Sequence, residues 1–254
     1  MQRIVAKDIS KTFHTGLRDA GVLATILFLF SGGYKKKSID AINSVSFECS
    51  PGEVVGLIGR NGCGKSTLLR LISGIYEKDE GSLEINGRAM YINGFGIGLN
   101  QRLTMRENIY LVGAILGISR KEIAAKIPEI VEFSGLADFL DTKIFQFSSG
   151  MSARLGFSAV TSFVAERRPS IILLDEVFEA GGDAEFQKRA IGKMEDFLKG
   201  DATVMLVSHQ TNVIRKYCPR TILLEKGRVL ADGDTEEVVK KYEGFLASLP
   251  TGDI

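Results

Sequence analysis

The spacing of apolar positions changes twice along the chain. Short, wholly apolar runs such as Ile171–Leu174 alternate with helical patterns towards both ends, whereas residues 104–165 have a helical period throughout. Apolar runs of this kind are typical of parallel strands covered on both faces, and their alternation with helices is typical of an α/β fold. We therefore expect a parallel sheet and a mostly helical lobe at 104–165. Strands are predicted at 4–13, 41–48, 54–58, 82–85, 89–92, 171–174, 202–207, 221–225 and 229–231, and further helices at 68–72, 183–199, 210–217 and 236–246.

Local signals mark the ends of several elements. Thr104 with Glu107, and Ser119 with Glu122, have the spacing of capping boxes, which predicts that a helix begins after each threonine or serine. Asn86-Gly87 separates two strand patterns, and this dipeptide is typical of a type I′ hairpin turn. We therefore expect strands 82–85 and 89–92 to pair as a hairpin.

Residues 14–40 interrupt the strand pattern and are interpreted as an insertion. Their apolar run, Val22–Phe30, has nine residues, whereas a membrane-spanning helix needs about 20. Two interpretations stay open. The run and the basic residues Lys35–Lys37 form either an insert packed on its own lobe, or an interfacial helix beside lipid head groups or a lipid pyrophosphate carrier.

Composition narrows the classes of function. The chain has 254 residues, 44% of them hydrophobic, which suffices for one large domain or two lobes that share a core. Its 32 basic and 31 acidic residues leave a net charge of +1, which argues against a general nucleic-acid binder. Three cysteines without metal-ligand spacing suit a reducing compartment, and Met1–Ile9 has no apolar core of a signal peptide. We expect a cytosolic protein whose contact with a membrane is peripheral or through a partner.

Residues 59–67, the glycine loop, fit the pattern G-x-x-x-x-G-K-[ST] between a predicted strand and a predicted helix. In that context glycines let backbone N–H groups converge on phosphate oxygens, and the helix directs the positive end of its dipole to the same point. Lys65 adds a positive charge for the β and γ phosphates, and the Ser66 hydroxyl is suited to bind Mg²⁺. The loop predicts nucleotide binding by Gly59, Asn61, Gly62, Cys63, Gly64, Lys65, Ser66 and Thr67.

Cys63 allows two interpretations within this loop. Its side chain is either a tolerated small group, or a thiolate stabilised by the helix start and by Lys65. In the second case ATP should slow the alkylation of the thiol.

Two acidic residues, Asp175 and Glu176, follow the predicted strand Ile171–Leu174. A buried strand that ends in a carboxylate delivers it to the carboxyl edge of the sheet, where α/β folds bind their ligands. Asp175 is predicted to hold Mg²⁺, and Glu176 to polarise the attacking water as general base.

Ser148, Ser149, Gly150 and Met151 lie at the start of a predicted helix. Two hydroxyls and a glycine there suit either a second anion site or an ordinary serine N-cap.

The order of these motifs resembles that of the ATP-binding subunits of ABC transporters, and the resemblance covers nearly the whole chain. Phe147–Met151 looks like a variant of the L-S-G-G-Q signature of that family. The resemblance implies a single ATP-binding domain, 1–254, with a P-loop ATPase core around the parallel sheet, an antiparallel β subdomain and a helical subdomain. The motifs in order are the glycine loop, the helical lobe 104–165, Ser148–Met151, Asp175–Glu176 and Val207–His209.

The same resemblance implies how the site works. Two copies of the chain would sandwich two ATP molecules, each between the glycine loop of one copy and Ser148–Met151 of the other. Phe13 would stack on adenine, although a place in the strand core also explains it. His209 matches the histidine that contacts the γ-phosphate, and both it and Glu176 are implied as catalytic.

Several segments resemble the polysaccharide exporters of the family, which move O-antigen, capsule or teichoic acid chains on lipid carriers. This implies an ATPase at the cytoplasmic face of the cell membrane that drives export of a lipid-linked glycan through two copies of a permease, without a nucleic-acid partner. Because the chain ends at Ile254, we expect it to lack the C-terminal carbohydrate-binding domain that some members of this group carry. The segments are 14–40, 103–110, 113–117, 148–155, 175–177 and 181–187.

Two alternatives and two departures stay open. The chain could serve an ABC exporter of lipids or drugs. It could also be a soluble ABC protein that acts on DNA or ribosomes, although proteins of that second class usually carry two ATPase units or a coiled-coil insertion. No glutamine occupies the family's usual Mg²⁺-binding position, so neither Asn93 nor Gln101 is assigned. Asp183 follows Asp175 one residue later than usual, which leaves its role in dimer contacts open.

Overall fold

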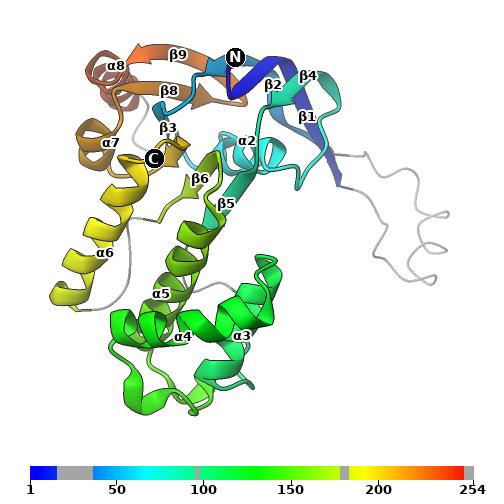
Figure 1. The fold of residues 1–254 in the computed structure, drawn as a ribbon. Coiled ribbons are helices and arrows are strands. Elements are labelled where there is room, and N and C mark those ends of the chain that lie inside the picture. Colours follow the sequence, from blue (N-terminus) through cyan, green and yellow to red (C-terminus); the bar gives the residue numbers. More distant parts are fainter. Residues whose placement is uncertain (16–36, 95–97, 178–182, 249–254) are drawn as a thin grey trace, which may run out of the picture.

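Two β-sheets and a group of helices make up the part of the chain that this computed structural model describes, residues 1–15, 37–94, 98–177 and 183–248 (Figure 1). The larger sheet has the strand order β5-β6-β7-β3-β8-β9, and its neighbouring strands are parallel except for the edge pair β8–β9. The expected parallel sheet is confirmed, with one antiparallel strand at its edge. Its strands are β3 (Val54–Ile58), β5 (Ala89–Asn93), β6 (Ile171–Asp175), β7 (Thr203–Val207), β8 (Arg220–Glu225) and β9 (Arg228–Asp234).

Successive residues of the central strands face different hydrophobic clusters, because side chains alternate across a sheet. Leu173 of β6 packs in a cluster with α2 (Lys65–Ile72) and the smaller sheet, whereas Leu174 packs in a cluster that joins the opposite face of the larger sheet to other helices. Strands β6 and β7 are consequently buried at every position. The helices of the second cluster are α5 (Ser149–Arg167), α6 (Ala184–Leu198), α7 (Thr211–Tyr217) and α8 (Thr235–Ala247).

The smaller sheet is antiparallel and has the order β2-β1-β4. Strands β1 and β2 are paired as far as Thr15 and Lys37, so the two ends of the predicted insertion 14–40 belong to these strands. Residues 16–36, which include the apolar run Val22–Phe30, lie outside the described residues. The strands are β1 (Ile4–Thr15), β2 (Lys37–Cys49) and β4 (Glu80–Ile85).

The predicted hairpin around Asn86-Gly87 is wrong. Strand β4 pairs with β1 of the smaller sheet, whereas β5 pairs with β6 of the larger one, so the dipeptide joins two sheets. The backbone N–H of Asn86 donates to the carbonyl of Arg3 at 2.9 Å, and its side-chain amide donates to the carbonyl of Gln2 at 2.8 Å. These bonds to the N-terminal segment replace the bonds that a two-residue hairpin would make.

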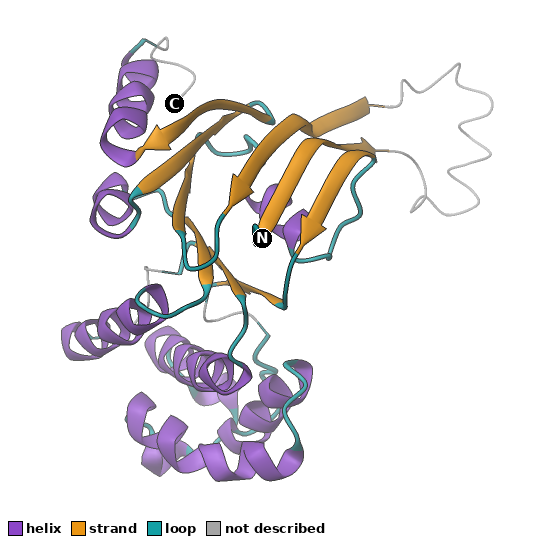
Figure 2. Cartoon of the chain, turned by 45° about the horizontal axis from the view of Figure 1, so that its top comes forward, coloured by secondary structure: helices purple, strands orange, loops and turns teal. Residues whose placement is uncertain are grey.

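Three long helices form a lobe below the larger sheet in Figure 1, and Figure 2 shows this lobe apart from the strands. They are α3 (Met105–Ile115), α4 (Arg120–Ser134) and α5, and the short 3₁₀ turns Ala137–Phe139 and Ile144–Gln146 connect α4 to α5. Both predicted capping boxes are present, at the starts of α3 and α4. The helices share their own hydrophobic cluster, while Phe157 of α5 packs in the cluster under the sheet, so α5 connects lobe and sheet. None of the described helices is both long and apolar enough to cross a lipid bilayer.

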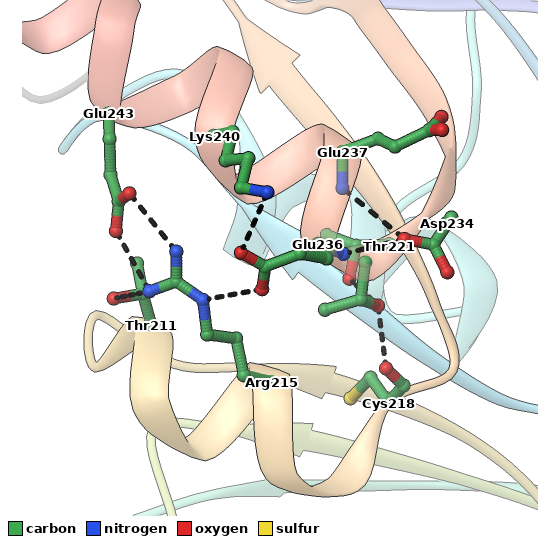
Figure 3. A network of polar contacts seen from close by, with 10 residues as sticks. Thr211, Arg215, Cys218, Thr221, Asp234, Glu236, Glu237, Lys240 and Glu243 are labelled. Carbon is green, nitrogen blue, oxygen red and sulfur yellow. Dashed lines mark hydrogen bonds and ion pairs between the residues drawn. The ribbon is translucent and has the colours of Figure 1, made fainter.

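Helix α7 is attached to α8 by a network of polar contacts, shown in Figure 3. The Arg215 guanidinium on α7 donates to Glu236 at 2.9 Å and to both carboxylate oxygens of Glu243 at 2.9 and 3.0 Å. These two carboxylates on α8 raise the pKa of Arg215. Because α7 begins two residues after His209, the network fixes the helix that follows this histidine.

Candidate functional site

A cavity of about 330 Å³ lies among the glycine loop and the residues that follow β6 and β7. These strand ends share one edge of the sheet because β6, β7 and β3 are parallel. A larger cavity of about 560 Å³ lies near Ser170 and Ala202 at the opposite ends of β6 and β7, and no predicted site residue lines it. The smaller cavity is lined by Phe13, Ile39, Asp40, Ala41, Asn61, Gly62, Gly64, Lys65, Ser66, Thr67, Glu176, His209, Lys226 and Gly227.

Three glycines of the loop are required by close approach of other atoms or by a positive φ. A Cβ at Gly59, where φ is +148°, would lie 2.0 Å from the carbonyl oxygen of Leu224, and a Cβ at Gly64, where φ is +111°, would lie 2.4 Å from that of Ala41. Gly62 has φ +76°, and no atom lies within 4 Å of its Cβ position. The loop is thus packed tightly against β2 and β8 and open above Gly62.

Lys65 is a cation of this loop and is only 6% exposed. Its Nζ donates to the carbonyl oxygens of Gly59 and Arg60 at 2.7 and 2.9 Å. The loop therefore holds the ammonium group beside the cavity before any phosphate is bound. Ser66 and Thr67 follow it in the first turn of α2 and also line the cavity.

Asp175 ends β6 and is buried, being 2% exposed. Its Oδ2 accepts a hydrogen bond from the Tyr91 hydroxyl at 2.7 Å, and burial together with this carboxylate raises the pKa of Tyr91 to about 12. The other oxygen, Oδ1, is buried and has no hydrogen-bond partner among the described residues. Buried carboxylate oxygens are normally paired, so this oxygen fits a bound cation.

Glu176 and His209 meet at the cavity. His209 Nε2 lies 2.5 Å from Glu176 Oε1, and both side chains are partly exposed. The backbone N–H of Glu176 donates to the carbonyl of Val207 at 3.1 Å, which joins the ends of β6 and β7. A carboxylate and an imidazole in this arrangement can together orient and deprotonate a water molecule.

Phe13 lies at the far side of the cavity, near the end of β1, and is partly buried. Its ring meets the edge of the Tyr76 ring, with centroids 5.2 Å apart, and Lys11 Nζ lies 5.7 Å from its centroid. The exposed part of the ring is available to a flat ligand in the cavity.

Ser148–Met151 do not line the cavity. Ser148 is the N-cap of α5, and its Oγ accepts a hydrogen bond from the backbone N–H of Met151 at 3.2 Å. One turn later, Arg154 forms an ion pair with Asp183 at 3.3 Å. The backbone N–H of Phe186, together with this arginine, lowers the pKa of Asp183, which is the N-cap of α6. Within one chain these residues are therefore separate from the glycine loop.

The interpretation of Cys63 as a thiolate is contradicted. Its side chain packs in the cluster between the two sheets and is 5% exposed, and burial raises the pKa of the thiol. The side chain does not line the cavity, so Cys63 acts as a small apolar group beneath the loop.

Sequence reasoning missed the contributions of β2 and of the β8–β9 turn to the cavity. Lys226 and Gly227 line it because Gly227 N–H donates to the carbonyl of Cys63 at 2.9 Å, which brings this turn onto the glycine loop. The only signal in the sequence was the glycine of the turn, which indicates a change of chain direction but does not indicate which segment the turn packs against. Asn93 is paired in register with Asp175 at the same sheet edge, whereas residues 95–97 and Gly181-Gly182 lie outside the described residues.

Comparison with known sequences agrees with this geometry. The sequence profile of the ABC transporter family matches residues 42–179. The O-antigen export system ATP-binding protein RfbB of Klebsiella pneumoniae is 41% identical over 82% of this chain and 82% of its own length. RfbB of Myxococcus xanthus is 36% identical over 97% of this chain and 57% of its own length. The teichoic acids export ATP-binding protein TagH of Enterococcus faecalis is 37% identical over 96% of this chain and 53% of its own length.

Solved structures with the same fold confirm the architecture. An ATP-binding subunit of an ABC transporter superposes with a TM-score of 0.68 at 24% identity, covering 94% of this chain and 93% of that chain. A dimeric ATP-binding cassette in a post-hydrolysis state, bound to ADP and Pi, gives a TM-score of 0.68 at 22% identity, covering 91% of this chain and 98% of that chain. The expected combination of a mostly parallel sheet, an antiparallel sheet and helices is that of these proteins.

Proposed function

The chain belongs to the ABC transporter family, and on that basis we propose that it is the ATP-hydrolysing subunit of an exporter of lipid-linked polysaccharide. The observation that carries the ATPase part is the cavity itself, which joins the glycine loop to Glu176 and His209. The cargo rests on relatives named for export of two different polysaccharides, O-antigen and teichoic acids.

In this function the predicted site residues of the cavity have distinct roles. The glycine loop and Lys65 bind the phosphates of ATP, Phe13 stacks on adenine, Glu176 orients and deprotonates the attacking water, and His209 contacts the γ-phosphate. The 2.5 Å contact between His209 and Glu176 supports these two roles, because it fixes the orientation of the Glu176 carboxylate.

Mg²⁺ fits the residues beside the phosphates, and we assign it to Ser66 and Asp175. The unpartnered Oδ1 of Asp175 supports this assignment. When bound, the ion neutralises charge on the β and γ phosphates and fixes their orientation.

A second copy of the chain completes the site in this proposal. Ser148 and Ser149 are exposed at the start of α5 and line no part of the cavity in their own chain. Hydroxyls and N–H groups at a helix start suit the γ-phosphate of an ATP molecule bound to the partner.

The membrane-spanning part of the exporter is a separate permease in two copies, and this chain binds it at the cytoplasmic face of the cell membrane. The lack of a membrane-spanning helix among the described residues agrees with this division. The lipid-linked glycan is then bound by the assembly.

The test is an export assay in cells whose own copy carries Lys65→Ala. We expect the unaltered chain to co-purify with a polytopic membrane protein, and the variant cells to lose surface polysaccharide while its lipid-linked precursor accumulates inside. Normal surface polysaccharide with impaired efflux of a drug or another lipid would overturn the cargo assignment.

A further inference from the structure

Tyr91 of β5 lies beside the metal ligand but belongs to no motif of the sequence. In the register of β5 and β6, Tyr91 pairs with Leu173 and Asn93 pairs with Asp175, so the tyrosine side chain reaches along the strand to the carboxylate. Its hydroxyl donates to Asp175 Oδ2 at 2.7 Å. Such a bond to a charged acceptor is short and directional.

The hydrogen bond from Tyr91 gives the two carboxylate oxygens of Asp175 different environments. Oδ2 is occupied by Tyr91, whereas Oδ1 is buried and lacks a partner among the described residues. A carboxylate held at one oxygen cannot rotate freely, and the second oxygen remains available to a cation. Groups that orient a metal ligand in this way contribute strongly to metal affinity.

Arg70 brings a positive charge near Tyr91 from the last turn of α2, the helix whose first turn contains Lys65 and Ser66. The phenol groups of Tyr91 and Tyr76 raise the pKa of Arg70, whose Nη1 donates a hydrogen bond to the Tyr76 hydroxyl at 3.4 Å. A carboxylate only accepts hydrogen bonds, so the proton of the Tyr91 hydroxyl is directed at Asp175.

We propose that Tyr91 is a positioning residue for the metal ligand, which holds Asp175 Oδ2 so that Oδ1 binds the divalent ion of the nucleotide complex. This role rests on the proposed function.

The test compares the affinity for fluorescent mant-ATPγS with excess Mn²⁺ and with EDTA, because a positioning role acts only on the metal-dependent part. Tyr91→Phe should weaken binding with Mn²⁺ about 10-fold, the lower end of the effect of groups that orient metal ligands. Binding in EDTA should stay unchanged. Asp175→Asn should lose the whole difference between the two conditions.

The matched control is Tyr110→Phe, which removes the same hydroxyl from α3, where the ring lies beside Arg120. It should bind as the unaltered chain does. Arg70→Gln, at a partly exposed position, should weaken binding with Mn²⁺ in the same direction and by less, and it carries the test if Tyr91→Phe does not fold.

Three results overturn the proposal: unchanged affinity with Mn²⁺ in both the Tyr91 and Arg70 variants, equal losses with Mn²⁺ and with EDTA, or the same loss in Tyr110→Phe. Failure of the unaltered chain to bind mant-ATPγS at all would instead refute the proposed ATPase function.

Discussion

Glu176 is held in a backbone conformation that few residues other than glycine adopt. Its φ is +56°, in the left-handed region, and its N–H is bonded to Val207 on the neighbouring strand. Such a conformation costs about 1–3 kcal/mol, which the surrounding structure must offset. The strain directs the carboxylate to His209 and the cavity, as expected for a residue that acts on water.

Replacing Glu176 with glutamine should separate binding from hydrolysis. The amide keeps the size of the side chain but cannot accept a proton from water, so turnover should fall roughly 10²- to 10⁴-fold while ATP binding is retained. Phosphate release and mant-ATP binding measure the two properties.

Glu237→Gln makes the same chemical change at an exposed position in the first turn of α8 (Figure 3) and serves as control. It should hydrolyse ATP normally. A Glu176 variant with normal turnover would contradict the role of general base.

At the scale of elements, the start of α3 depends on one buried side chain. Asn108 is 0% exposed, and its Oδ1 accepts a hydrogen bond from the N–H of Asn100 at 2.7 Å. Its Nδ2 donates to the carbonyls of Asn100, Leu103 and Thr104 at 3.1, 3.3 and 2.9 Å. One amide thus ties the loop that enters the helical lobe to the first turns of α3.

Asn108→Ala should lower the free energy of unfolding by about 1–3 kcal/mol, because it removes the hydrogen bonds of a buried amide and leaves the Asn100 N–H without its partner. Urea unfolding of the full chain measures the change. Asn212→Ala at an exposed position of α7 is the control, with an expected change within about 0.5 kcal/mol. Equal stabilities of the two variants would show that the loop finds other partners.

At the scale of the whole molecule, helices and sheets exclude water from three thiols. Burial raises the pKa of Cys218 to about 12 from an ordinary value of 9.0, and the pKa of Cys49 also to about 12. The folded state therefore keeps these protons at a pH where the unfolded chain loses them. Stability is fully present below pH 9 and is lost as the pH rises towards 12.

Cys218→Ala should flatten this dependence. In the unaltered chain under reducing conditions, Cys218 contributes a loss of about 1.4 kcal/mol per pH unit between the two pKa values. Urea unfolding at a series of alkaline pH values should show a shallower slope for the variant, whatever its stability at neutral pH. Identical slopes would mean that the Cys218 thiol titrates alike in both states.

The arrangement of the two lobes also bears on the proposed dimer. The glycine loop lies on the sheet, whereas Ser148–Met151 lie at the start of α5 in the helical lobe, outside the cavity. Their role in binding ATP of a partner stays a prediction.

The sequence by itself determined the features that depend on near neighbours in the chain. The glycine loop, the two capping boxes and the apolar strands ending in Asp175 and Val207 each specify their own backbone, because their bonds and φ angles are local. The place of Asp175 and Glu176 at the carboxyl edge of the sheet followed as well, since parallel strands end at one edge.

Only the tertiary structure decided the contacts between distant segments. The separation of β4 from β5, the burial of Cys63, the bond from Tyr91 to Asp175 and the place of Lys226 at the cavity all depend on which elements pack together. Such contacts are set by strand order and by burial across the sheets, which apolar periodicity alone does not specify, because the same alternation suits more than one partner strand.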